Sequence, residues 1–374
     1  MASRAERLKR LPLRDNLRGL EPYGAPQLQA PVLLNVNENT YGIPESVRHA
    51  MIRRVEQELK TLNRYPDREF TELRTALARY LGHELTAENI WAANGSNEVL
   101  QQMMQAFGGP GRSLLSFPPT YSMYPLLASA TDTEYLSGFR DEDFQISAES
   151  AAAQVKTQAP ELIVLCSPNN PTGTALSLEV IEAVYTASEP YRSIVIVDEA
   201  YAEFARPGTP SALTLLPGRE RLVVSRTMSK AFALAGARLG YLAAAPEVTD
   251  ALRLVRLPYH LSALTQAAAL AALDHSEALQ AEVEQIKAQR DRIAERLAQL
   301  GLKPAESDAN FVFFRGVTDP QQLWRELLDA GVLIRDVGFA GALRVTAGTP
   351  QETTAFLDAM ERILQAEPTL VHHD

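Results

Sequence analysis

Short runs of apolar residues without alternating polarity recur along the first two thirds of the chain. Such runs are typical of strands that are buried on both faces of a parallel sheet, because a half-exposed strand alternates apolar and polar residues. The runs predict strands at residues 90–93, 114–117, 162–166, 194–197 and 222–224.

The intervals between these runs show the spacing of helices. Apolar residues recur at helical spacing over residues 69–81, and Gly82 ends the pattern, as glycine commonly does after a helix. Comparable patterns predict helices over residues 97–107 and 176–189. Strands that alternate with helices are typical of βαβ units. The sequence therefore predicts an α/β fold whose large domain has a mostly parallel sheet sandwiched by helices.

A second, smaller domain is predicted in the C-terminal part. A helical stretch without proline spans residues 262–300, and its alanine-rich first half suits burial against a globular body, so we interpret it as a connecting helix. After it, short apolar runs and helical spacing alternate. They predict strands at residues 311–314, 332–334 and 343–345, and helices at 320–328 and 352–364. This mixture indicates a compact α+β domain.

The length of 374 residues also fits two domains, because a domain commonly holds about 150 residues. Prolines interrupt the first forty residues, which are nevertheless too apolar for a disordered tail. We expect an arm that wraps onto a larger body and contributes to the small domain. The predicted boundaries are 1–40 for this arm, 41–260 for the large domain, 261–300 for the connecting helix and 301–374 for the small C-terminal domain.

Composition and charge narrow the function classes. Hydrophobic residues make up 46% and charged residues 22% of the chain, which is typical of soluble proteins and excludes a fibrous or disordered chain. The net charge of −10 argues against a general binder of nucleic acids or anionic membranes. A single cysteine, Cys166, excludes an internal disulfide and a cysteine-based zinc site.

Targeting and metal signals are weak in this sequence. No apolar run approaches the roughly 18 residues of a membrane span, and the basic N-terminus is not followed by the apolar stretch of a secretory signal. The only neighbouring histidines, His372 and His373, lie in the C-terminal tail, where they are interpreted as frayed and not as metal ligands. We expect a cytoplasmic protein without a metal site, a membrane partner or a nucleic-acid partner.

Polar side chains gather where three of the predicted strands end. The strands run directly into residues 167–173, 198–201 and 225–240. Because the carboxyl ends of parallel strands share one edge of a sheet, where ligands bind in such folds, these segments are expected to meet. Each segment alone has an ordinary explanation as a turn or a helix cap. Together they place a lysine, a carboxylate, an amide, a phenol and a phosphate clamp on one rim.

Pyridoxal phosphate is a cofactor that needs this set of groups. Lys230 is the predicted Schiff-base lysine, which then carries the proton between the substrate and the cofactor. Asp198 is expected to pair with the ring nitrogen, so that the ring withdraws electrons. Tyr201 and Asn170 are expected to donate to the ring oxygen. The predicted phosphate ligands are Thr227, Ser229 and Arg238.

A second phosphate-binding element is predicted between the strand at residues 90–93 and the helix that follows. Free backbone N–H groups and the helix dipole make such a turn an anion site. The residues of this turn are Gly95, Ser96 and Asn97.

On these motifs the chain resembles the fold-type I aminotransferases of the aspartate aminotransferase superfamily, and within them the histidinol-phosphate aminotransferase branch. The resemblance covers nearly the whole chain. Two positions depart from the branch, which usually has proline at Thr40 and often an acidic residue at Asn97. The segments that carry the resemblance are residues 34–39, 64–67, 95–98, 119–124, 167–173, 198–201 and 227–240, with Arg335 and Arg344.

The resemblance implies further roles. Tyr121 is expected to stack on the cofactor ring. Tyr65 is expected to reach the cofactor phosphate of the neighbouring subunit, which implies a homodimer. Arg344 is expected to bind the α-carboxylate of glutamate or the phosphate of histidinol phosphate. The substrate site is completed by Tyr23, Asn37 and Arg335.

The implied reaction converts L-histidinol phosphate and 2-oxoglutarate into imidazole acetol phosphate and L-glutamate, a step of histidine biosynthesis. Two alternatives use the same cofactor. An aminotransferase for aromatic amino acids needs the same residues but an apolar pocket in place of a second anion site. A decarboxylase of a phosphorylated amino acid needs its carboxylate held perpendicular to the ring, an orientation that the residue pattern does not specify.

Overall fold

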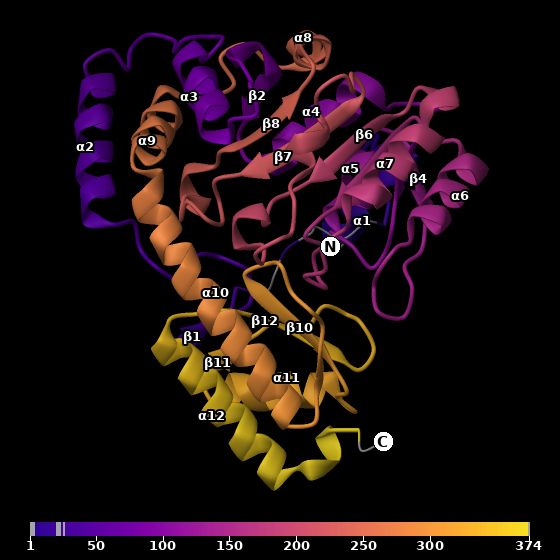
Figure 1. Ribbon diagram of the computed structural model, residues 1–374, viewed down its shortest axis with the longest axis vertical. Coiled ribbons are helices and arrows are strands. Elements are labelled where there is room, and N and C mark those ends of the chain that lie inside the picture. Colours follow the sequence, from indigo (N-terminus) through magenta and orange to yellow (C-terminus); the bar gives the residue numbers. More distant parts are fainter. Residues whose placement is uncertain (1–3, 20–23, 25–26, 373–374) are drawn as a thin grey trace.

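In the computed structural model, which describes residues 4–19, 24 and 27–372, seven strands form a central sheet (Figure 1). Their order across the sheet is β2-β8-β7-β6-β5-β3-β4. All neighbouring pairs are parallel except those of β8, which is antiparallel to β2 and β7. The strands are β2 (Ile90–Ala93), β3 (Ser113–Ser116), β4 (Glu134–Ser137), β5 (Leu162–Cys166), β6 (Ile194–Asp198), β7 (Leu222–Thr227) and β8 (Gly240–Ala244). The predicted α/β class with a mostly parallel sheet is confirmed.

The five strands predicted in this part of the chain are present, and two further strands were not predicted. β4 lies at the edge of the sheet and is only partly buried, so its residues do not form a continuous apolar run. β8 begins at Gly240, inside the segment interpreted as part of the phosphate clamp. An antiparallel strand of this kind is specified by its pairing with β2 and β7, which is a long-range property.

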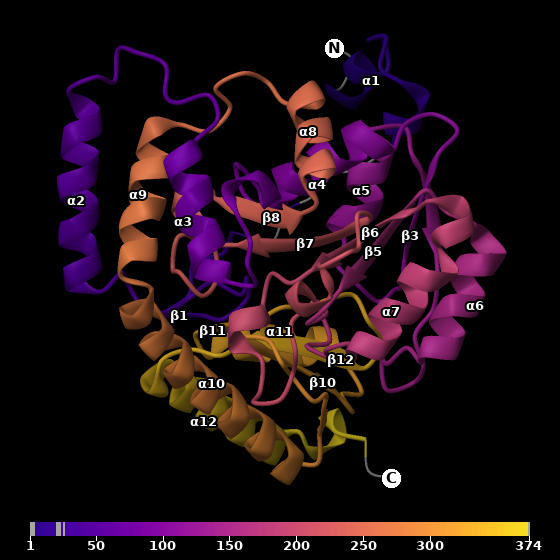
Figure 2. The same cartoon turned by 45° about the horizontal axis from the view of Figure 1, so that its top comes forward.

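Helices cover both faces of this sheet (Figure 2). The helix α4 packs with α5 and α8, and a separate pair is formed by α6 and α7. The fully buried strands β2, β3, β5, β6, β7 and β8 need this double cover because apolar side chains leave both of their faces. The helices are α3 (Thr71–Leu81), α4 (Ser96–Phe107), α5 (Met123–Ala130), α6 (Ala148–Gln158), α7 (Leu178–Ala187) and α8 (Pro246–Val255).

The stretch at residues 262–300 differs from the single helix that the sequence predicts. It forms two helices, α9 (Ala263–Asp274) and α10 (Ser276–Gln299), because His275 between them leaves the helical conformation at φ −124° and ψ 28°. The break lets α9 pack against α2 (Glu45–Leu59) while α10 runs on to the C-terminal elements (Figure 1). The prediction of one uninterrupted helix was therefore wrong, since no proline or glycine marks this break.

The C-terminal elements form a second group below the sheet in Figure 1. An antiparallel sheet has the order β12-β10-β9. The arm joins this group, because β1 (Val32–Leu33) pairs in parallel with β11. The other elements are β9 (Lys303–Pro304), β10 (Phe311–Arg315), α11 (Pro320–Asp329), β11 (Val332–Leu333), β12 (Ala342–Thr346) and α12 (Pro350–Ala366).

The start of the arm lies against the large sheet's helices instead. α1 (Arg4–Leu8) precedes a segment in which Arg14 and Asn16 donate hydrogen bonds to the carbonyl oxygens of Ala130 and Ser129, at 2.8 and 2.9 Å. The arm therefore crosses from the large sheet to the C-terminal group. Among the described residues, no helix has the length and apolar character that a membrane crossing needs.

Candidate active site

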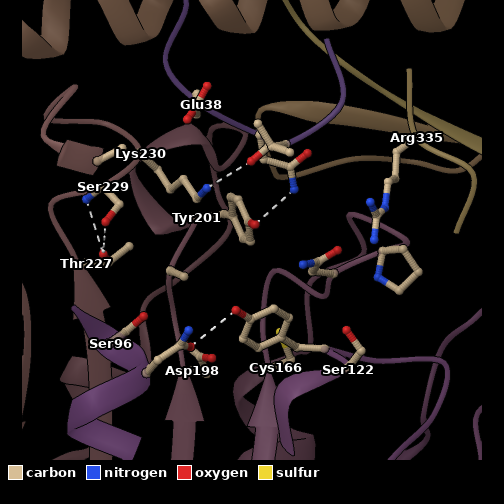
Figure 3. Close-up of a pocket in the computed structure, with 18 of the residues that line it drawn as sticks. Glu38, Ser96, Ser122, Cys166, Asp198, Tyr201, Thr227, Ser229, Lys230 and Arg335 are labelled. Atoms are coloured by element: carbon tan, nitrogen blue, oxygen red, sulfur yellow. Dashed lines mark hydrogen bonds between the residues drawn. The ribbon is translucent and has the colours of Figure 1, made fainter. Parts of the chain in front are cut away.

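A cavity of about 490 Å³ lies where the arm and the C-terminal group meet the carboxyl ends of the large sheet's parallel strands (Figure 3). The polar segments that the sequence analysis placed on one rim therefore do meet. The predicted site residues that line this cavity are Asn37, Ser96, Asn97, Tyr121, Asn170, Asp198, Tyr201, Thr227, Ser229, Lys230, Arg238, Arg335 and Arg344.

Lys230 is prepared for attack on a carbonyl group. Its Nζ atom donates a hydrogen bond to the carbonyl oxygen of Val36, at 3.2 Å. Burial, followed by the positive charge of Arg344, lowers the pKa of Lys230 to about 8. A larger fraction of neutral amine is therefore present near neutral pH than for an ordinary lysine, and the neutral amine is the nucleophile.

Asp198 ends the buried strand β6 and is 3% exposed. Its Oδ2 atom accepts a hydrogen bond from the hydroxyl of Tyr124, at 2.8 Å. Its Oδ1 atom is buried and has no hydrogen-bond partner among the described residues. Burial raises the pKa of this carboxyl group to about 6. A buried carboxylate oxygen without a partner, on the wall of a cavity, matches the N–H group of a cationic ring.

Tyr124 opposes the effect of burial on Asp198, because its hydrogen bond lowers the pKa of the carboxyl group. We expect the affinity of the protein for pyridoxal phosphate to fall on acidification, as Asp198 becomes protonated. In Tyr124→Phe this fall should begin at a pH higher by about one unit, the effect of losing one hydrogen bond to a charged group. The measurement is equilibrium binding of the cofactor at several pH values from 5 to 8. Ionisation of the cofactor itself affects both proteins equally, so it cancels in the comparison. Superimposable curves would contradict the assignment.

Tyr201 and Asn170 both line the cavity, and each accepts a hydrogen bond from another residue there. The hydroxyl of Tyr201 accepts a hydrogen bond from Nδ2 of Asn37, at 3.0 Å, and burial raises the pKa of Tyr201 to about 12. Tyr201 therefore stays a neutral phenol, able to donate a proton in a hydrogen bond. Asn170 accepts a hydrogen bond through Oδ1 from Nη1 of Arg344, at 2.5 Å.

The opposite end of the cavity is suited to a dianion. Arg238 donates through Nη1 to Oγ of Ser229, at 3.4 Å, and the hydroxyl of Thr227 donates to the same oxygen, at 3.1 Å. The first turn of α4 starts beside them at Ser96, so that free N–H groups and the helix dipole add positive potential. The structure therefore brings together the groups that the sequence analysis predicts to bind the phosphate.

Two glycines make this close approach possible. A Cβ atom on Gly240 would lie 2.1 Å from the backbone nitrogen of Ser96, and one on Gly95 would lie 2.4 Å from Nη2 of Arg238. Gly95 also has a φ of +86°, in the region that favours glycine. Gly95 therefore supports the clamp from behind it and does not line the cavity.

Two arginines enter the cavity from the C-terminal group. The backbones of Arg335 and Arg344 pair with each other through hydrogen bonds of 2.9 and 3.0 Å. Arg344 also donates through Nη2 to the carbonyl oxygen of Asn35, at 3.0 Å, and its guanidinium lies over the ring of Phe311. The carboxylate of Asp336 accepts from the backbone nitrogen of Gly338. Arg335 is labelled beside the cavity in Figure 3.

Some predicted residues have other surroundings. Tyr65 is outside the cavity, 80% exposed, and stacks on Tyr259 with ring centroids 4.4 Å apart. Tyr23 lies outside the described residues. Of the two departures from the branch, Thr40 donates to the carboxylate of Glu352, and Asn97 accepts from the hydroxyl of Tyr121, at 3.2 Å.

The sequence analysis missed several contributors. Tyr124 had a signal, because it lies in the 119–124 motif three residues after Tyr121, but its contact with Asp198 joins residues 74 positions apart. Glu38 lines the cavity and is a carboxylate whose charge raises the pKa of Lys230. The carbonyl oxygen of Val36 had no signal, since every residue carries such a group.

Comparisons with known proteins identify the family of this chain. The profile of the family described as aminotransferase class I and II matches residues 30–360. A protein named histidinol-phosphate aminotransferase from Paenarthrobacter aurescens is 71% identical over 97% of this chain and 98% of its own length. One of the same name from Frankia casuarinae is 57% identical over 95% of this chain and 90% of its own.

Solved structures show the same fold. The structure of histidinol-phosphate aminotransferase from Sinorhizobium meliloti in complex with pyridoxal-5'-phosphate has a TM-score of 0.84 at 24% identity, covering 95% of this chain and 98% of that one. The structure of aspartate aminotransferase from Thermus thermophilus with maleate has a TM-score of 0.78 at 26% identity, covering 90% and 92%. With its profile match, its close relatives and this fold, the chain belongs to the class I and II aminotransferase family.

Proposed function

We propose that this chain is a pyridoxal-phosphate-dependent aminotransferase that interconverts L-histidinol phosphate and 2-oxoglutarate with imidazole acetol phosphate and L-glutamate. The observation that carries the proposal is that Lys230 and Asp198, whose buried Oδ1 atom has no hydrogen-bond partner among the described residues, line the same cavity. The relative that is 71% identical bears the name of this enzyme, which supports the choice of substrate.

The residues present fit the cofactor. When bound, pyridoxal phosphate supplies a carbonyl carbon for the amine and a ring that withdraws electrons from it. Lys230 would hold that carbon and move a proton between the substrate and the cofactor. Asp198 would hold the proton of the ring nitrogen, while Tyr201 and Asn170 would bind the ring oxygen. Tyr121 would cover the ring, and the phosphate would be held by Ser96, Thr227, Ser229 and Arg238.

The enzyme must accept two unlike amino donors, and the paired arginines explain how. Glutamate has two carboxylates, whereas histidinol phosphate has a phosphate and an imidazole. Arg344 would bind the α-carboxylate of glutamate or the phosphate of histidinol phosphate. Arg335 would supply a second guanidinium group for the same anion. Because Arg335 and Arg344 pair directly through their backbones, one anion can contact both.

We expect Arg335→Ala to lower kcat/KM for histidinol phosphate by about 100-fold, the effect of losing a charge-assisted hydrogen bond. Activity with L-phenylalanine should change much less. Unphosphorylated histidinol should be a poor substrate of the unchanged enzyme, because it leaves the arginines without an anion. Steady-state kinetics with the three substrates check this, with Arg325→Ala on the exposed side of α11 as the matched control.

The same kinetics, with a phosphorylated amino acid as a fourth substrate, separate the two alternatives. Equal efficiency with histidinol and histidinol phosphate would favour an aminotransferase for aromatic amino acids. Release of carbon dioxide from a phosphorylated amino acid, without formation of a keto product, would favour the decarboxylase. The location of the protein in the cytoplasm stays a prediction.

We also propose a homodimer in which Tyr65 binds the cofactor phosphate of the partner subunit. The surface around Tyr65 supports this proposal. Leu254 and Leu257 are 86% and 76% exposed, and they precede Tyr259, on which Tyr65 stacks, by five and two residues in the sequence. Large apolar side chains that gather on a surface favour burial against another protein. A second copy of the chain is the partner that the family resemblance implies.

A mixing experiment tests whether the site is shared between subunits. If Tyr65 acts in the partner's site, Tyr65→Ala and Lys230→Ala subunits form mixed dimers that keep one intact site. After co-refolding, activity should recover to about a quarter of the wild-type value, since half of the dimers are mixed and each has one working site. Lys230→Ala mixed with Asp198→Asn is the control, because neither of its sites is intact. Sedimentation of a fully active monomer would overturn the dimer proposal.

A further inference from the structure

Asn37 lines the cavity in an unusual backbone conformation. It lies on the arm, is 2% exposed, and has a φ of +57°, in the left-handed region that asparagine tolerates better than most residues. Its backbone nitrogen donates to Oγ1 of Thr346, at 3.1 Å, and its carbonyl oxygen accepts from Nδ2 of Asn310, at 3.1 Å. The C-terminal group therefore holds this residue in place.

Both ends of the Asn37 side chain are also engaged. Its Oδ1 atom accepts from the hydroxyl of Thr346, at 3.1 Å, and its Nδ2 atom donates to the hydroxyl of Tyr201, at 3.0 Å, the bond marked at Tyr201 in Figure 3. Little of this side chain is left for contact with a substrate. A continuous set of hydrogen bonds instead joins Thr346 of β12 through Asn37 to Tyr201.

The direction of these bonds determines what Tyr201 does with its proton. Because the hydroxyl oxygen of Tyr201 accepts from Asn37, its own hydrogen must be directed elsewhere. Among the described residues, the Tyr201 hydroxyl has no second hydrogen-bond partner. The ring cannot turn freely, since Tyr201 is 5% exposed and packs edge-on against Phe311. The O–H group therefore points its hydrogen into the cavity.

We infer that Asn37 is a positioning residue that orients the proton of Tyr201 toward the cofactor, and that it does not bind the substrate directly. The inference rests on the proposed function, in which Tyr201 binds the ring oxygen of pyridoxal phosphate. A donor at that oxygen stabilises its negative charge and so favours the deprotonated form of the bound cofactor. Removing or turning away this donor raises the pKa at which the visible absorbance of the bound cofactor changes.

Asn37→Asp is the decisive variant, because aspartate also tolerates a positive φ. Its carboxylate can only accept, so it takes the Tyr201 proton away from the cavity. We expect the spectral pKa of the bound cofactor to rise by about one unit, as for the loss of a hydrogen bond to a charged group. Asn37→Gly, which keeps the backbone conformation and removes the amide, should shift it less and in the same direction.

The added charge is controlled in two ways. Asn39→Asp puts the same charge two residues further along the arm, where Asn39 bonds to the carbonyl oxygen of Ala231 and to the backbone nitrogen of Tyr41; it should shift the spectral pKa clearly less. In Tyr201→Phe the hydroxyl is absent, so Asn37→Asp should add little to the shift of Tyr201→Phe alone. This non-additivity is the signature of one shared hydrogen bond.

The outcomes separate the inference from the proposed function. Shifts of Asn37→Asp and Tyr201→Phe that simply add would overturn the inference. An unchanged spectral pKa in Asn37→Asp with a raised KM for the amino donor would also overturn it and assign Asn37 to direct substrate contact. If Tyr201→Phe itself leaves the spectral pKa unchanged, the proposed role of Tyr201 fails instead.

Discussion

Replacement of Lys230 by alanine is expected to abolish multiple turnover, lowering kcat by about 10⁴-fold or more, because the proposed function takes both the nucleophile and the mobile proton from this one side chain. The surroundings of Lys230 support both tasks. Burial and the charge of Arg344 lower its pKa to about 8, so that the amine gives up and regains a proton near neutral pH. The measurement is steady-state kinetics together with the visible spectrum of the protein mixed with pyridoxal phosphate.

Two further variants sharpen this test. Lys230→Arg keeps the positive charge and lacks the amine, so it should be as inactive as Lys230→Ala. Lys287→Ala on α10 removes a lysine that pairs with Glu284 on the same helix, and it should keep full activity. A small primary amine added to Lys230→Ala should restore part of the proton transfer. Near-normal turnover of Lys230→Ala would show that another residue carries the chemistry.

Asp198→Asn should separate catalysis from stability. The amide cannot neutralise a positive ring nitrogen, so kcat should fall by about 10²- to 10³-fold, as when a preorganised electrostatic group is removed. Cofactor binding should survive, because the phosphate clamp is untouched. Unchanged activity would show that another group keeps the ring nitrogen protonated.

The same variant should stabilise the protein without its cofactor. Burial raises the Asp198 pKa from 3.8 to about 6, so the ionised form destabilises the fold once the pH exceeds the unfolded value. The resulting loss of unfolding free energy grows between pH 4 and 6 and then stays constant. It reaches about 3 kcal/mol, because one pKa unit corresponds to about 1.4 kcal/mol. Asp198→Asn should therefore unfold at a higher temperature than the wild type at pH 7, and at the same temperature below pH 4.

The neighbouring carboxylate is the matched control. Glu199 is buried like Asp198, but its Oε2 atom forms an ion pair with Nη2 of Arg226, at 2.7 Å, and its Oε1 atom accepts from the backbone nitrogen of Ala212, at 2.6 Å. Glu199→Gln leaves the buried Arg226 with a weaker partner and should destabilise the protein by about 3 kcal/mol. At neutral pH the unfolding temperature should therefore rise in Asp198→Asn and fall in Glu199→Gln. Thermal unfolding of both variants, measured over a range of pH, checks this.

Much of the fold could be predicted from local sequence patterns. The strands β5, β6 and β7 are runs of apolar residues, and their burial on both faces is visible in the residues themselves. The polar residues at their ends then follow from chain order, because parallel strands bring their carboxyl ends to one edge. The break at His275 and the strand β8 could not be predicted in this way, since packing against distant elements decides both.

The available chemistry can be read from the residue types along the chain: the lysine, the carboxylate, the phenol and the arginines, together with the strand ends that carry several of them. The surroundings that tune these groups arise from contacts in the folded protein. Tyr124 reaches Asp198, Val36 holds Lys230, and Asn37 orients Tyr201 across separations of 74, 194 and 164 residues. Such contacts depend on burial and hydrogen-bond geometry between segments that are distant in sequence, and no local residue pattern encodes them.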